Sequence, residues 1–282
     1  MLFENNIGEN LSIDETSLSN GELYTIVTNK EAKGRKGSIV AIIEGTKAKD
    51  VIKVLAKISS KKRELVKEVT LDMAANMNLI IKRSFPKASR VIDRFHVQKL
   101  ASEAVQNIRI KYRWEAISNE NLAIEQAKKN NIEHEPVVLS NGDTIRQLLV
   151  RSRHLLFKPE NRWTSSQVQR ARHLFQLFPD IKKAYELAQL LTYIYENNTQ
   201  SNIAIVKLAR WYNKVEESGF KDFNTVAKSI QVHYQGILNY FDNRSTNASA
   251  ESFNAKLKSF RNEFKGVRDT KFFLFRLTNI FA

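Results

Sequence analysis

Hydrophobic and polar positions alternate in short runs through the first hundred residues, which is the pattern of β-strands. Strands are predicted at residues 10–18, 23–28, 38–44, 65–72 and 89–92. Between them, residues 47–58 and 74–83 place apolar side chains at helical spacing. Thr46 is the predicted N-cap of the first helix, and Pro86 stops the second. The predicted order of elements is therefore β-β-β-α-β-α-β.

This order predicts a single mixed sheet. Three consecutive strands can pair as an antiparallel meander, and the two strands that follow helices can add to it in parallel. Helices would then cover the faces of the sheet, as in α/β proteins. We therefore expect an α/β fold with the topology of an RNase H-like domain.

From Val97 to about Tyr240 the pattern becomes helical almost throughout, with one loop at residues 132–143 that contains Pro and an Asn-Gly turn. A further helix is predicted from about Asn247, and residues 270–281 form a last apolar helix or tail. We expect three segments: residues 1–97 form the first part of the core, 98–243 an all-helical insertion, and 244–282 the helices that complete the core.

The charge of the chain is unusual, with 45 Lys and Arg against 30 Asp and Glu, a formal net charge of +15. Such an excess indicates a polyanionic partner. Nucleic acid is favoured over a membrane surface, because no strongly basic amphipathic segment opposes a Trp/Leu face. The absence of cysteine excludes disulfides and thiolate zinc sites. With no apolar run near the roughly 20 residues that span a bilayer and no secretory signal, we expect a cytoplasmic protein of the nucleoid, without membrane or small-molecule partners.

Two acids occupy informative positions in the predicted strands. Asp14 lies inside the first strand, and Asp72 ends the fourth. In the predicted sheet these strands are neighbours, so the two carboxylates would repel each other unless a cation such as Mg²⁺ lay between them. A third carboxylate from a later helix would complete a site for two metal ions. Taken singly, each Asp is more simply explained as a turn or strand-end residue.

Asp93 and His96 form a second candidate group directly after the fifth strand. They should lie at the same end of the sheet as Asp72, where α/β folds tend to build their sites. Such a pair could orient a metal ligand or contact DNA. A lone histidine is more often a packing or surface residue.

Three stretches carry a resemblance to a known family: VTLDMAANM, SFPKASRVIDRFHVQKLASEAVQNIR and ESFNAKLKSFRNEFKGVRD. They look like the signature blocks of bacterial insertion-sequence transposases of the L-three family. That family belongs to the DDE superfamily and is related to Mutator-like enzymes with a C/D-x-x-H signature. The resemblance extends from Asp14 to the C-terminus, and its second block is the most specific.

The resemblance implies that Asp14, Asp72 and Glu251 are the catalytic acids and hold two Mg²⁺ (or Mn²⁺) ions. It makes Asp93 and His96 the D-x-x-H pair. The implied activity is DNA cleavage and strand transfer at insertion-sequence ends, by a homodimer assembled on transposon-end and target DNA. Two alternatives stay open: Asp93 could be a direct metal ligand instead of Asp72, and Glu251 could be a helix-capping acid.

Basic residues flank these acids and suit the positioning of phosphates. We expect DNA contacts from Arg94, Lys99, Asn254, Lys256, Lys258 and Arg261. Trp114, Trp163 and Trp211 each follow an arginine. These tryptophans could stack on flipped bases, but core packing is the favoured interpretation.

The beginning of the chain departs from the family pattern, since such transposases carry a Cys-rich zinc module and a helix-turn-helix before the first acid. We therefore expect a catalytic region of a longer protein, a split reading frame or a relic. Two other functions remain open. One is an inactive, transposase-derived DNA-binding protein, and the other is an RNase H-like nuclease without strand transfer.

Overall fold

The computed structural model describes residues 1–17, 22–264 and 269–282, with only the backbone of Ser249. Its five-stranded sheet comprises β1 (Asn10–Ser17), β2 (Leu23–Asn29), β3 (Ile39–Glu44), β4 (Glu68–Leu71) and β5 (Ser89–Ile92), in the order β3-β2-β1-β4-β5. The first three strands pair antiparallel, whereas β4 runs parallel to both β1 and β5. The predicted mixed α/β sheet is confirmed; Leu18, predicted to end the first strand, lies outside the described residues.

The chain divides into two compact units. The first, which we call the sheet unit, contains Met1–His96, Thr199–Ser201 and Val232–Ala282. The second, the helical unit, contains Val97–Asn198 and Asn202–Gln231. The sheet unit therefore consists of segments that are far apart in the sequence.

Helices α1 (Ala48–Leu55), α2 (Ser60–Arg63) and α3 (Ala75–Ser84) accompany the strands, with short 3-10 turns at Glu4–Asn6 and Lys30–Ala32. The predicted cap of α1 is wrong, because Lys47 occupies the N-cap position. Thr46 instead offers its carbonyl oxygen to the Asn76 side chain at 3.2 Å. β4 begins three residues later than predicted because the backbone N–H groups of Leu65 and Val66 still donate to carbonyl oxygens of the last two residues of α2.

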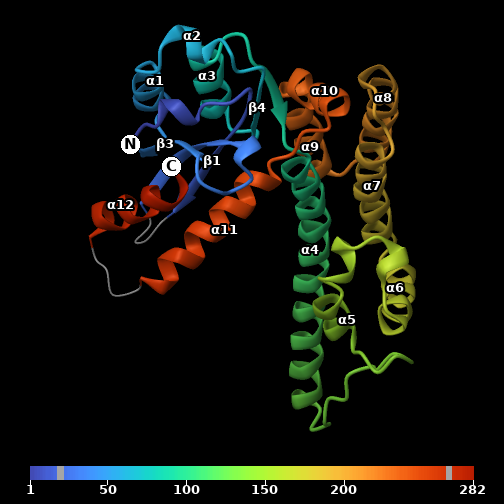
Figure 1. Ribbon diagram of the computed structural model, residues 1–282. Coiled ribbons are helices and arrows are strands. Elements are labelled where there is room, and N and C mark those ends of the chain that lie inside the picture. Colours follow the sequence, from blue (N-terminus) through green and yellow to red (C-terminus); the bar gives the residue numbers. More distant parts are fainter. Residues whose placement is uncertain (18–21, 265–268) are drawn as a thin grey trace. The chain divides into compact units, whose positions relative to one another are not determined.

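The helices of the sheet unit lie on opposite sides of the sheet (Figure 1). α1 and α3 cover one side, and α11 (Ala248–Glu263) and α12 (Thr270–Phe281) cover the other. On the second side a buried cluster joins Tyr24, Ile26, Ile39 and Ile42 of the sheet to Phe253 and Leu257 of α11 and Phe273, Leu274 and Leu277 of α12. Each fully buried side chain of this size contributes about 1.5–3 kcal/mol. This packing fixes α11 against the sheet.

Helix α10 (Tyr234–Asn243) packs against β5. The Asn239 side chain donates to the carbonyl oxygen of Arg90 at 2.8 Å, which satisfies an acceptor on the edge strand. Gly236 permits the approach, since a Cβ there would lie 2.8 Å from Cγ1 of the buried Ile92. The glycine is therefore required by close packing.

The helical unit contains α5 (Ile145–Arg151), α6 (Ser165–Leu177), α7 (Pro179–Glu196), most of α4 (Arg94–Lys129) and α8 (Ser201–Ser218), α9 (Lys221–Val232) up to Gln231, and 3-10 turns at Leu155–Phe157 and Glu160–Arg162. The predicted helical character of this region is confirmed. Capping boxes at Thr144 and Thr164 start α5 and α6. Among the described residues, no helix is long and apolar enough to cross a membrane.

Candidate metal-binding active site

Three aspartates occupy aligned positions on neighbouring strands: Asp14 within β1, and Asp72 and Asp93 directly after β4 and β5. Ser12 pairs with Thr70, and Leu71 pairs with Ile92. Continuing this register brings Asp14 beside Asp72, and Asp72 beside Asp93. The backbone N–H of Asp93 still donates to the carbonyl of Leu71 at 3.0 Å, so the register holds at this end of the sheet. Aligned residues of parallel strands share a face, so the three acids belong to one side of the sheet.

Asp14 is held by two hydrogen bonds. Its Oδ1 accepts the Glu15 backbone N–H at 2.9 Å, and its Oδ2 accepts the Asn254 side-chain N–H at 2.6 Å. Burial raises the pKa of Asp14 to about 6. The Glu15 N–H and the positive charge of His96 oppose that rise, whereas the negative charges of Asp72 and Glu251 add to it. Asp14 therefore lies in an excess of negative charge.

Asp72 has a turn role and an electrostatic role. Its Oδ1 accepts the backbone N–H of Ala74 at 2.9 Å just before α3, as expected for an aspartate that follows a strand. Its negative charge contributes to the raised pKa values of both Asp14 and His96. The turn role and proximity to the other acids therefore coexist in one side chain.

Asp93, His96 and Glu251 form the tightest group of potential metal ligands among the described residues. One ligand atom from each lies within 4.8 Å of the others. Asp93 is buried, its Oδ2 lies 3.3 Å from His96 Nδ1, and its Oδ1 accepts the Asn247 backbone N–H at 3.2 Å. The hydrogen bond to Asp93 raises the pKa of His96, against the effect of burial, and the charges of Asp93, Asp72 and Asp14 raise it further.

Helix α11 brings Glu251 and Asn254 to the acids. Phe253 and Leu257 are its buried apolar positions, and they pack into the core of the sheet unit. Glu251 and Asn254 are three residues apart and thus share a helix face. Burial raises the pKa of Glu251, and the charge of Asp93 adds to this rise. Glu251 lies in the first turn, as the capping alternative requires, but its carboxylate also faces Asp93 and His96.

Asn247 is a residue of this site that the sequence interpretation did not single out, except as a possible cap. Its side chain makes no cap hydrogen bond, and its backbone N–H donates to Asp93. The side-chain amide is fully buried and has no hydrogen-bond partner among the described residues. No sequence signal distinguishes this role from helix capping, because the contact with Asp93 spans 154 positions.

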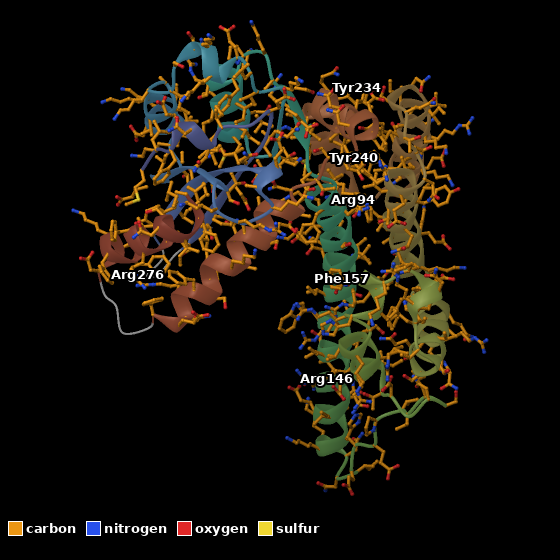
Figure 2. The ribbon with its side chains drawn as sticks, viewed as in Figure 1. Arg94, Arg146, Phe157, Tyr234, Tyr240 and Arg276 are labelled. Carbon is orange, nitrogen blue, oxygen red and sulfur yellow. The ribbon has the colours of Figure 1, made fainter. Side chains whose placement is uncertain are left out.

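The residues predicted to contact DNA have different surroundings. Arg94 begins α4, and the basic residue Arg276 lies on α12 (Figure 2). Lys99 and Lys258 are exposed, Lys256 donates to the carbonyl of Gly34 at 3.1 Å, and Arg261 lies 5.0 Å from the Phe273 ring centre. Asn254 is buried against Asp14. Two further basic residues that follow Arg261 in the sequence, Lys265 and Arg268, lie outside the described residues.

The three tryptophans differ in burial. Trp211 is fully buried and donates to the Leu187 carbonyl, and Trp163 donates to the Leu155 carbonyl. Core packing is therefore confirmed for Trp211, and Trp163 packs against neighbouring aromatic rings. The same interpretation is wrong for Trp114, which lies on α4 and is 61% exposed.

The donor set fits a divalent cation. Carboxylate oxygens are the preferred ligands of Mg²⁺, and an imidazole nitrogen beside them suits Mn²⁺ as well. Burial is the main cause of the raised pKa values of Asp14 and Glu251, and the negative charges of neighbouring acids add to it. A bound cation would relieve this repulsion.

Comparison with known proteins agrees with this architecture. Residues 11–277 match the DDE transposase family ISL3, described as a transposase family. This α/β chain therefore belongs to the ISL3 family of DDE transposases. It is also similar to the transposase for insertion sequence element IS1001 from Bordetella parapertussis, with 23% identity over 276 residues. The match covers 97% of this chain and 61% of that protein.

Proposed function

We propose that this chain is the catalytic region of an insertion-sequence transposase and performs divalent-metal-dependent DNA cleavage and strand transfer. The main support for this proposal is that Asp14, Asp72 and Asp93 lie near Glu251. Helix α11 brings Glu251 to them from the far end of the chain. Membership of the ISL3 family supplies the reaction class. An RNase H-like core and a relation to Mutator-like enzymes belong to the same proposal, and the sheet order supports the former.

In this proposal Asp14, Asp72 and Glu251 hold the metal ions, and Asp93 and His96 support them. Asn254 fixes the Asp14 carboxylate through its 2.6 Å hydrogen bond. His96, hydrogen-bonded to Asp93, places positive charge among the acids. Since ligand atoms of Asp93, His96 and Glu251 lie within 4.8 Å of one another, a direct ligand role for Asp93 is part of the proposal.

Two Mg²⁺ or Mn²⁺ ions bound here would supply an activated water or 3′-hydroxyl and stabilise the leaving oxygen. The contribution of the chain is to hold its acids close together on one side of the sheet. Exposed Lys99 and Lys258 would bind phosphates of the transposon-end and target DNA. Handling two DNA ends together would require a homodimer assembled on DNA.

The test combines metal binding with product analysis. Mn²⁺ titration followed by electron paramagnetic resonance should show binding to the 282-residue chain, weakened in Asp14→Asn and Glu251→Gln. Asp72→Asn and Asp93→Asn, compared in parallel, identify which acid is the second ligand. Asp50→Asn is the matched control, since Asp50 is an exposed acid on α1.

The same proteins are then offered a DNA end with a free 3′-hydroxyl and a supercoiled target plasmid. Joined product that depends on Mg²⁺ supports the transposase proposal. Nicking without joined product points to a nuclease, and binding without cleavage points to an inactive DNA-binding relative. Either of the last two results would contradict the proposal.

A further inference from the structure

A buried ion pair lies on the acidic side of the sheet but takes no part in the group of acids. Lys30 Nζ and Glu68 Oε1 are 3.2 Å apart, and their side chains are 15% and 10% exposed. Lys30 also donates to Thr70 Oγ1 at 2.8 Å. Glu68 and Thr70 precede Asp72 on β4 at alternate positions, so they share its face. The pair therefore lies on the same face of the sheet as Asp72, nearer the start of β4.

Both members of the pair bind the chain as it leaves α10. Glu68 Oε2 accepts the Asn243 side-chain N–H at 2.8 Å. Lys30 Nζ donates to the hydroxyl of Ser245. These two contacts bracket Arg244, and they span 175 and 215 positions of the sequence.

Arg244 adopts the left-handed conformation, with φ of +54°. A side-chain-bearing residue in this region costs on the order of 1 kcal/mol or more, and it persists where its surroundings impose it. Here the residues on either side are tied to the Lys30–Glu68 pair. The direction in which the chain turns after α10 is thus set by a contact with the sheet.

Helix α11 begins directly after this turn. Two residues beyond Ser245, the Asn247 backbone N–H donates to Asp93. The Asn247 carbonyl then accepts the Glu251 N–H at 2.9 Å, as the first turn of α11 forms. A change in the path at Arg244 would therefore displace Glu251 and Asn254 relative to the strand-end acids.

We propose that Lys30 and Glu68 are positioning residues that fix where α11 begins, and so hold Glu251 and Asn254 against Asp93 and Asp14. The metal-binding part of this inference rests on the proposed function, but the placement of residues 243–251 does not. A buried ion pair adds little net stability over neutral side chains of similar volume. In this protein, the ion pair instead specifies the path that the chain takes after α10.

The test uses the double variant Lys30→Met/Glu68→Gln, which removes both charges and leaves neither uncompensated. Ser245→Ala is a milder second variant that removes only the contact to Lys30. Lys30→Arg keeps the positive charge and should therefore behave like the wild type. The matched control is Arg146→Met/Glu120→Gln, which removes both charges of an ion pair in the helical unit.

Two readouts are made on each variant of the 282-residue chain. Hydrogen exchange without metal reports the Glu251 amide, whose protection should fall in the double variant and, to a smaller extent, in Ser245→Ala. Mn²⁺ titration should show an affinity lowered by about 10- to 100-fold in the double variant, the range for residues that orient metal ligands. The control and Lys30→Arg should match the wild type in both readouts.

Wild-type exchange at Glu251 in both the double variant and Ser245→Ala would overturn the inference. Unchanged Mn²⁺ affinity in the double variant would overturn its metal-binding part. If the wild type itself binds no Mn²⁺, the proposed function fails, while hydrogen exchange still decides the positioning role. If the double variant does not fold, Ser245→Ala decides both questions.

Discussion

Each unit buries aspartates, but their surroundings differ. In the helical unit, the buried Asp143 is paired with Arg151 and Arg170, the latter at 2.8 Å. Burial works to raise its pKa, yet the hydrogen bonds from the two arginines outweigh this and hold the pKa below its usual value. In the sheet unit, burial raises the pKa of Asp14 to about 6, with its carboxylate bound by uncharged donors.

The difference separates an acid whose charge is neutralised within the fold from acids whose charge is not. Asp143 is neutralised within the fold, so it is ionised without need of a ligand. Asp14 and Glu251 instead have His96 as the cation that lowers their pKa values, while neighbouring acids raise them. Folding has left them short of positive charge, which is the condition a metal ion relieves.

The largest expected effect concerns activity. Asp14→Asn or Glu251→Gln should lower the rate of DNA cleavage by about 10³-fold or more, since metal ions contribute several kcal/mol to such reactions. The folded state should persist, because neither change opens a cavity. Cleavage of a labelled duplex and thermal unfolding measure the two quantities. Activity within tenfold of wild type would remove these acids from the site.

The next effect concerns stability in the helical unit. Asp143→Ala should lower the free energy of unfolding by about 3 kcal/mol, since it leaves two arginines without their buried partner. Urea unfolding measures the change. Mn²⁺ affinity should stay at the wild-type value. A loss of affinity would show that destabilising the helical unit also impairs metal binding by the sheet unit.

A smaller effect depends on pH. The folded-state pKa of Asp14 lies above its ordinary value of 3.8, so its ionisation costs stability as pH rises through about 6. Asp14→Asn carries no such charge. Its stability relative to wild type should therefore rise by about 2 kcal/mol between pH 4.5 and pH 8 without metal. Urea unfolding at both pH values tests this, and a constant difference would mean that Asp14 titrates normally.

The smallest effect is a packing change inside the sheet unit. Gly236→Ala places a Cβ against the Ile92 side chain and should cost about 1–2 kcal/mol by pushing α10 from β5. Thermal unfolding measures this cost. The Mn²⁺ affinity should change far less than in Asp14→Asn. An equal loss in both variants would indicate that general destabilisation, and not the acids, controls metal binding.

Much of the fold could be predicted from local patterns. The runs LYTIVT and SIVAIIE predicted β2 and β3, and SRVI predicted β5, because alternation and β-branched residues are readable within a few positions. Helix starts were less predictable. Thr46 has the side chain of a typical N-cap, but Lys47 occupies the cap position. The Thr46 carbonyl oxygen accepts a hydrogen bond from Asn76, 30 positions away.

The candidate site was predictable in its composition and less so in its contacts. Asp14 was expected inside the first strand, and Asp72 and Asp93 at the ends of the fourth and fifth; the strand register aligns these three positions. Asn254 was expected to contact DNA, yet its side chain binds Asp14 across 240 positions. The roles of Asn247 and Lys30 also depend on long-range contacts that leave no periodic signal.

The sequence by itself determined the order of the strands and helices, the placement of acids at strand ends and the excess of positive charge. These depend on residue type and on spacing over a few positions. Only the tertiary structure decided which acids meet Glu251. That choice follows from where Phe253 and Leu257 pack and from the turn at Arg244, because a helix carries its polar face to wherever its apolar face is buried.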